Sequence, residues 1–188
     1  DLQEEEADLE ELAEVSEQST TDSLYVDDNG VLHIKEGVTL SGTITIPTEA
    51  VEIPEGLFKG ANIEKVTTEA GSKLITIGNE AFSGCKKLTS VSLRNVTIIG
   101  NGAFYDCSNL NFVQGPNLEN IGDQAFADCV KLESISLGKV KTIGSKAFSN
   151  CKSLTDNVLD MSSAENPWEL QYIGDSAFFN CTGFKILN

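Results

Sequence analysis

The amino-acid sequence predicts an α/β repeat fold, a solenoid of short strands and helical turns with an N-terminal β cap. Three observations support this prediction. A nine-residue pattern, I-G-x-x-A-F-x-x-C, occurs five times in the 188 residues. The first four copies are spaced by 22 residues and the last follows after 30, and the apolar residues that flank each copy recur with it. Regular repeats of this length are typical of solenoids, in which each coil buries its apolar face against its neighbours.

Residues 1–22 are expected to form an acidic, disordered leader. They contain ten Asp and Glu residues and no Lys or Arg, so they supply −10 of the formal net charge of −16. A block of like charge stays solvated, although a partner-binding acidic helix is the alternative. The whole chain is too acidic to favour nucleic acid or an anionic membrane surface as partners. We expect no membrane insertion either, because no apolar run approaches the ~18 residues of a spanning helix.

Residues 23–50 are predicted to form the N-terminal β cap. Two short apolar runs flank Asn29-Gly30, and Asn-Gly is the strongest short signal for a hairpin. Residues 38–46 then alternate between apolar and polar types, as a strand with one buried face does. We expect this cap to cover the edge of the first coil, which would otherwise be free to pair with another chain.

Residues 51–188 are predicted to form about six coils. A degenerate copy of the pattern begins at Ile53, and the complete copies begin at Ile77, Ile99, Ile121, Ile143 and Ile173. After each copy, the spacing L-x-x-[VI]-x-L ends in an alternation that predicts a short strand. This spacing and the period of 22 residues fall within the range of leucine-rich repeats.

A helical turn is expected inside each copy, with its Ala and Phe facing the core. The residue after each Ile-Gly is of a type favoured at helix N-caps. These residues are Asn79, Asn101, Asp123, Ser145 and Asp175. The residue before each Cys tolerates the left-handed conformation that ends a helical turn. The repeated Gly is expected at a tight corner, where a side chain would clash.

All five cysteines of the chain occupy the last position of the pattern. They are Cys85, Cys107, Cys129, Cys151 and Cys181. Stacked coils place the Cα atoms of neighbouring cysteines ~5 Å apart, a distance that permits a disulfide. A repeated core position nevertheless favours buried, reduced thiols. The chain has no C-x-x-C pair and a single histidine, His33, so we expect neither a metal nor a cofactor. We expect that the protein is not an enzyme, because a catalytic base such as His33 would need a nucleophile and an orienting group beside it.

The residues beside the central Val or Ile of each strand should point away from the core and form an extended surface. This surface is polar and rich in hydroxyl groups, and Phe112 is its large apolar exception. Trp168 lies in an insertion and joins the candidates because Trp is enriched at binding hot spots. The candidate binding surface consists of Lys65, Thr67, Ser90, Ser92, Phe112, Gln114, Ser134, Ser136 and Trp168. A plain solvated sheet, with Trp168 holding its loop against the solenoid, is the alternative.

The pattern I-G-x-x-A-F-x-x-C-x-x-L-x-x-[VI] resembles the BspA-like, or Treponema-type, leucine-rich repeats over about residues 44–188. The resemblance implies a bacterial surface or secreted protein without catalytic residues, which binds a protein or glycan of the host or of a neighbouring cell. It implies an extracellular or cell-surface location, which we expect to follow the removal of a leader preceding Asp1. A structural spacer that displays another domain of a longer surface protein is the alternative. The last copy stops at Asn188, where its strand should form, so we expect the solenoid to be truncated there.

Overall fold

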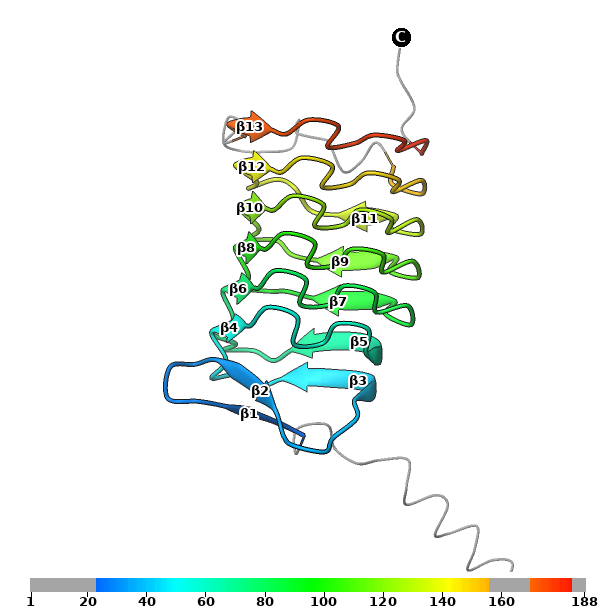
Figure 1. Ribbon diagram of the computed structural model, residues 1–188. Helices are drawn as coiled ribbons and strands as arrows, with labels where there is room; N and C mark the ends of the chain where they lie inside the picture. Colours follow the sequence, from blue (N-terminus) through cyan, green and yellow to red (C-terminus); the bar gives the residue numbers. More distant parts are fainter. Residues whose placement is uncertain (1–22, 156–169, 184–188) are drawn as a thin grey trace, which may run out of the picture.

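The computed structural model describes residues 23–155 and 170–183. Over these residues the chain winds as a stack of similar coils, from a blue N-terminal hairpin to β13 at the other end (Figure 1). The acidic leader, Trp168 and the strand expected at the end of the last coil lie outside the described residues.

One side of the coils is a five-stranded parallel sheet, made of the strands that the alternating apolar pattern predicts. Its members are β3 (Ser41–Ile46), β5 (Asn62–Thr68), β7 (Ser90–Ser92), β9 (Phe112–Gln114) and β11 (Ser134–Ile135). Val66, Val91, Val113 and Ile135 are paired in register and buried. The central apolar residue of each strand therefore faces the core, and its two neighbours face outward.

A second side of the coils is a six-stranded parallel sheet. Its members are β4 (Glu52–Ile53), β6 (Thr76–Ile77), β8 (Ile98–Ile99), β10 (Asn120–Ile121), β12 (Thr142–Ile143) and β13 (Tyr172–Ile173). The repeated Ile of each coil pairs with the Ile of the next, as Ile77 does with Ile99. The sequence does not predict these strands, because two residues are too few to display a period of two.

The predicted N-terminal hairpin is present. β1 (Leu24–Val26) and β2 (Leu32–Ile34) pair antiparallel on either side of the Asn-Gly turn. Val31 forms a parallel bridge to Glu52, which attaches the hairpin to the beginning of the six-stranded sheet. The third predicted strand of this region, β3, pairs in parallel with β5 and is the first strand of the five-stranded sheet.

The prediction of helical turns is wrong, because the described residues contain no helix. The segment 78–85 forms consecutive β-turns, in which Ala81, Ser83 and Cys85 donate their N–H groups to the carbonyl three residues earlier. The intervening N–H groups donate to the next coil, as Phe82 does to the carbonyl of Ala103 at 2.7 Å. Glu80 adopts φ 52°, a left-handed conformation that interrupts a helix.

The predicted N-cap residues connect coils instead of capping helices. The Oδ1 of Asn79 accepts a hydrogen bond from the backbone N–H of Asn101 at 2.8 Å. Asn101 and Asp123 repeat this contact with Asp123 and Ser145, at 2.9 and 2.7 Å. Residue types that satisfy a free N–H at a helix start satisfy the same group on a neighbouring coil, so they do not distinguish the two structures.

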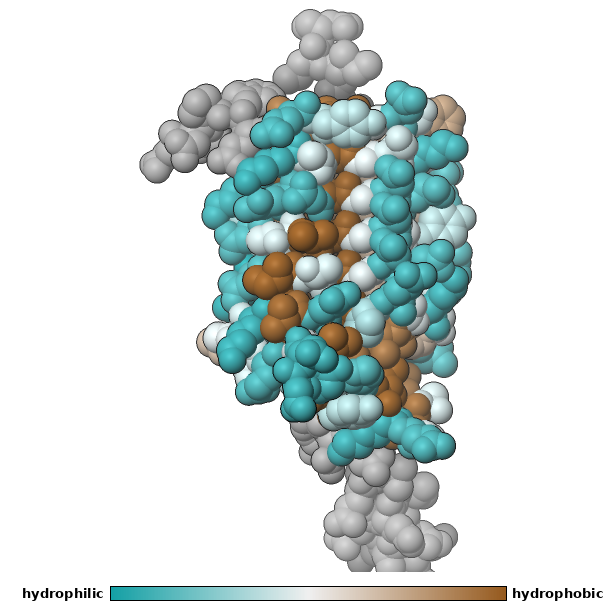
Figure 2. All heavy atoms as spheres, turned by 60° about the vertical axis from the view of Figure 1, so that its left-hand side comes forward, coloured by the Kyte–Doolittle hydropathy of each residue, from teal (hydrophilic) through white to brown (hydrophobic). Residues whose placement is uncertain are grey.

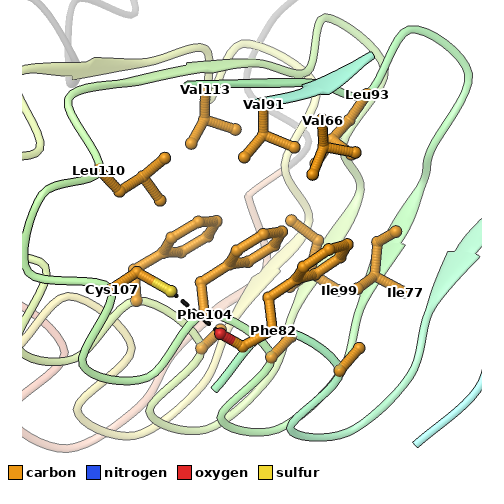
Figure 3. Packing of buried hydrophobic residues seen from close by; sticks show 14 of the residues in the cluster. Val66, Ile77, Phe82, Val91, Leu93, Ile99, Phe104, Cys107, Leu110 and Val113 are labelled. Atoms are coloured by element: carbon orange, nitrogen blue, oxygen red, sulfur yellow. Dashed lines mark hydrogen bonds between the residues drawn. The ribbon is translucent and has the colours of Figure 1, made fainter. Parts of the chain in front are cut away.

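The core lies between the five-stranded sheet, the six-stranded sheet and the β-turns. Five buried Phe side chains and the half-buried Phe178 stack in one column, with ring centroids 5.0–5.3 Å apart. In Figure 3 the side chains of Val91 and Val113 point toward the rings of Phe82 and Phe104. The repeated Gly allows close stacking, as predicted: a Cβ at Gly100 would lie 2.7 Å from the backbone nitrogen of Asn79.

Candidate functional site

The outer face of the five-stranded sheet brings together eight of the nine predicted surface residues. They form two rows that cross the strands. Lys65, Ser90, Phe112 and Ser134 are paired in one row. Thr67, Ser92 and Gln114 lie two residues further along their strands, and Ser136 follows β11 directly. The ninth residue, Trp168, lies outside the described residues.

Phe112 is the largest exposed apolar side chain of these rows, and half of it is accessible to solvent (50%). Its neighbours in the row are Ser90 and Ser134, which are too small to cover an aromatic ring. Exposed rings bury a large apolar area when a partner binds, and they lose little conformational freedom. Phe112 is therefore suited to act as the apolar anchor of a contact on this face.

Hydrogen bonds fix most of the second row. Thr67 Oγ1 lies 3.0 Å from Thr45 Oγ1 and 3.3 Å from the carbonyl oxygen of Ile44. Ser92 donates to Oε1 of Gln114 at 3.3 Å. In the first row, by contrast, the side chains of Lys65, Ser90 and Ser134 have no hydrogen-bond partner among the described residues. Their polar groups are thus available to a ligand beside Phe112, whereas those of the second row are partly used within the sheet.

A second exposed apolar strip lies along the six-stranded sheet. It consists of Val51, Ile75 and Ile98 on three successive coils, and each is more than a third exposed. Figure 2 shows brown apolar side chains among teal hydrophilic ones on this side of the molecule. In the sequence, this strip is indicated by the doublet Ile98-Ile99. The neighbouring coils have a polar residue, Thr76 or Asn120, before the repeated Ile.

The N-terminal hairpin holds the single histidine. His33 Nε2 lies 3.0 Å from Asp27 Oδ2, and the His33 ring stacks on Tyr25 with centroids 5.0 Å apart. Asp27 also accepts the N–H groups of Asn29 and Val31. The hydrogen bond from His33, followed by the one from Val31, lowers the pKa of the Asp27 carboxyl. Asp27 thus stabilises the hairpin loop through these three contacts. His33 has in Asp27 a structural partner that the sequence does not predict.

The five cysteines are buried and unpaired, as the repeat position predicts. Each thiol donates to the carbonyl oxygen of a core Phe in the preceding coil, as Cys85 does to Phe58 at 3.0 Å. Burial raises the pKa of Cys85 to about 12 and that of Cys181 to about 11. Such thiols are protonated at neutral pH, and the thiolate is the nucleophilic and metal-binding form.

In the described parts of the chain, no group of three His, Cys, Asp or Glu side chains is placed to hold a metal ion. No helix long and apolar enough to cross a membrane occurs in the same residues.

Three solved structures of bacterial leucine-rich repeat proteins are similar to this chain. A protein from Bacteroides ovatus ATCC 8483 is 29% identical, with a TM-score of 0.62. The alignment covers 78% of this chain but only 36% of that protein, so this chain spans about a third of its length. A search of curated proteins found no matching sequence.

The other two structures are similar in fold at lower identity. The T. pallidum leucine-rich repeat protein is 22% identical, with a TM-score of 0.64, and the alignment covers 87% of this chain and 88% of that one. A leucine-rich cell surface protein from Faecalibacterium prausnitzii A2-165 is 20% identical, with a TM-score of 0.61, and the corresponding shares are 86% and 51%.

The family comparison agrees with the repeat pattern. The family described as the BspA type leucine-rich repeat region matches residues 37–155 with six copies, which is well over half of the chain. The matched residues contain the five buried Phe side chains of the column and four of the five buried cysteines. The chain therefore belongs to the BspA-type leucine-rich repeat family.

Proposed function

We propose that this chain is a non-enzymatic recognition module of the bacterial surface, which binds a protein or glycan of a host or neighbouring cell. The contact would form on the outer face of the five-stranded sheet, with Phe112 as its anchor. The observation that carries the proposal is the exposure of this ring between two small residues, Ser90 and Ser134, whose hydroxyl groups have no partner among the described residues.

The surface location rests on the family and on one structural relative. The F. prausnitzii structure is described as a leucine-rich cell surface protein, and it shares this fold. The present chain spans only part of that protein and of the B. ovatus protein, 51% and 36% of their lengths. An extracellular or cell-surface location is proposed for this chain on these grounds.

The mechanism of binding would be many weak contacts rather than one deep pocket. Successive coils present equivalent positions in straight rows, and a solenoid offers extended surfaces of this kind to its partners. Phe112 would supply apolar contact area, while Lys65, Ser90 and Ser134 would supply hydrogen bonds. Display of many copies on a cell would raise the effective affinity through avidity.

A structural spacer is the second candidate function. The continuous stack of coils favours it, because the core runs without interruption from Leu24 to Cys181 through the described residues. Such a stack would hold another domain away from the cell without binding anything itself. A spacer needs no exposed aromatic ring on its sheet, so Phe112 favours recognition over this alternative.

The experiment that tests the proposal is a binding screen against immobilised host matrix proteins and a glycan array. The variants are Phe112→Ser, which removes the anchor, and Ile98→Ser, which removes an apolar residue of similar exposure (41%) from the other sheet. We expect Phe112→Ser to weaken binding at least tenfold, or about 1.4 kcal/mol, and Ile98→Ser to bind like the wild type. Equal binding by the wild type and Phe112→Ser would reject this face as the site, and no binding at all would favour the spacer.

A further inference from the structure

A shallow hollow of about 620 Å³ lies on the surface formed by the β-turns, which we call the turn face (segments 54–61, 78–85, 100–107 and 122–129). The residues that line the hollow come from four successive coils. They include Gly102 and Tyr105, with Glu80, Asn101, Asp123 and Gln124 on the same and the adjacent coils. None of the predicted surface residues lines it, so it is separate from the Phe112 face.

Gly102, which lacks a side chain, lies beside Tyr105 in this hollow. The equivalent residues of the two adjacent coils are Glu80 and Gln124, and all three have a left-handed backbone, with φ of 52°, 59° and 54°. A Cβ at Gly102 would meet nothing closer than Glu80 Cγ at 3.5 Å, which is an ordinary contact. Neither the backbone conformation nor a clash therefore requires glycine here, and the effect of this glycine is the open space beside Tyr105.

The Tyr105 ring is accessible from this space. It is 38% exposed, and the residues at the same position in the adjacent coils are Ser83 and Ala127, which are too small to cover it. The negative charge of the nearby Asp128 carboxylate raises the pKa of Tyr105. The exposed ring offers an apolar platform to a ligand.

The polar groups around the ring include both donors and acceptors. The Oδ1 atoms of Asn79 and Asn101 already accept backbone N–H groups, which leaves their NH₂ groups as the available donors. Neither NH₂ group has a partner among the described residues, and the same holds for the Gln124 amide. Glu80 and Asp123 supply carboxylate oxygens as acceptors, and Lys59 of this hollow is ion-paired with Glu80.

This combination selects one class of ligand. A sugar ring presents an apolar C–H face to an aromatic ring, and its hydroxyl groups both donate and accept hydrogen bonds. An anionic ligand would be repelled by the carboxylates, and the one lysine of the hollow is already paired. A cationic ligand would use the carboxylates and the ring but would leave the NH₂ donors of Asn79 and Asn101 unsatisfied.

We infer that the hollow over Gly102 binds a neutral sugar ring of a glycan, stacked on Tyr105 and hydrogen-bonded by Asn101, Gln124 and Asp123. The site lies on a different face from Phe112, so it stands or falls independently of the proposed function. The chain would then carry a carbohydrate contact in addition to its sheet surface.

The test is binding of the purified chain to neutral, sialylated and sulfated oligosaccharides on an array, followed by calorimetry with the strongest neutral ligand. Two variants address the site: Tyr105→Ala removes the platform, and Gly102→Gln fills the hollow with the side chain that the adjacent coil carries at position 124. Gln124 holds the same left-handed backbone, so Gly102→Gln should fold normally. The control is Phe179→Ala, which removes an aromatic ring at the same repeat position that is 63% exposed.

We expect binding of a neutral glycan that both site variants weaken at least tenfold, and that Phe179→Ala and Phe112→Ser leave within twofold of the wild type. The absence of neutral-glycan binding would overturn the inference, as would wild-type affinity in both site variants. Capture of a lysine-rich peptide in place of neutral glycans would also overturn it, because the hollow would then be a cation site. Loss of glycan binding only in Phe112→Ser would reject this site while supporting the sheet face.

Discussion

The buried cysteines show how a single residue type is fitted to the repeat. Each thiol is enclosed by the core and donates to a Phe carbonyl oxygen of the preceding coil. The position of Cys in every copy, without a C-x-x-C pair or a nearby His, is enough to predict this role. The acceptor of the S–H group is not predictable, because it depends on the stagger between coils.

The raised thiol pKa values make stability depend on pH. Because burial raises the pKa of Cys85 to about 12 in the folded chain, against ~8.5 in an unfolded one, the folded state keeps the proton at pH values where the unfolded state loses it. The contribution to stability is therefore complete below about pH 8.5 and is lost as the pH rises toward 12. Urea unfolding at pH 7 and pH 10 measures this loss, with Cys85→Ala as the control.

The expected result is a decrease in unfolding free energy at pH 10 that is smaller in Cys85→Ala than in the wild type. The same chain should react with a thiol reagent only after unfolding, because all five cysteines are buried. Equal pH dependence in the two proteins, or rapid reaction of the folded chain, would contradict the assigned environment.

The β-turn segment shows what is decided at the level of an element. Its N–H groups donate alternately within the turn and to the next coil, and a helix has no N–H groups left for such contacts. Neighbouring coils must also approach closely, which explains the Gly that follows each repeated Ile. Gly100 and its equivalents face backbone atoms of the preceding coil.

Substitution of these glycines tests the close stacking. A Cβ at Gly100 would lie 2.7 Å from the backbone nitrogen of Asn79, so Gly100→Ala forces adjacent coils apart. We expect a loss of about 1–3 kcal/mol, the usual range for overpacking. Gly138→Ala is the matched control, since its Cβ would meet nothing within 4 Å. Thermal and urea unfolding should place Gly138→Ala near the wild type; similar stability of Gly100→Ala would show that the coils are not closely stacked.

The strands were predictable to different degrees for a physical reason. The strands around Val66, Val91 and Val113 have one buried face, so their sequence alternates. The strands at Ile77 and Ile99 are two residues long and carry no such pattern. Helical turns were expected because Asn, Asp and Ser favour N-caps, but the same side chains also accept hydrogen bonds across coils.

At the scale of the molecule, equivalent residues of successive coils form rows on three faces: the five-stranded sheet, the six-stranded sheet and the turn face. The face of the five-stranded sheet follows from the sequence, because its outward positions alternate with the buried ones. The strip of Val51, Ile75 and Ile98 does not follow, since the strands beneath it are not predictable. The hollow over Gly102 does not follow either, because the residues that line it come from four coils.

The central claim is that recognition occurs on the face of Phe112. The most direct measurement is hydroxyl-radical footprinting with mass spectrometry, comparing the free chain with its complex with the strongest ligand from the binding screen. Phe112 should be oxidised in the free chain and protected in the complex, whereas Tyr172 and Phe179, which are also exposed, should react equally in both. Unchanged oxidation of Phe112 in a saturated complex would contradict the claim.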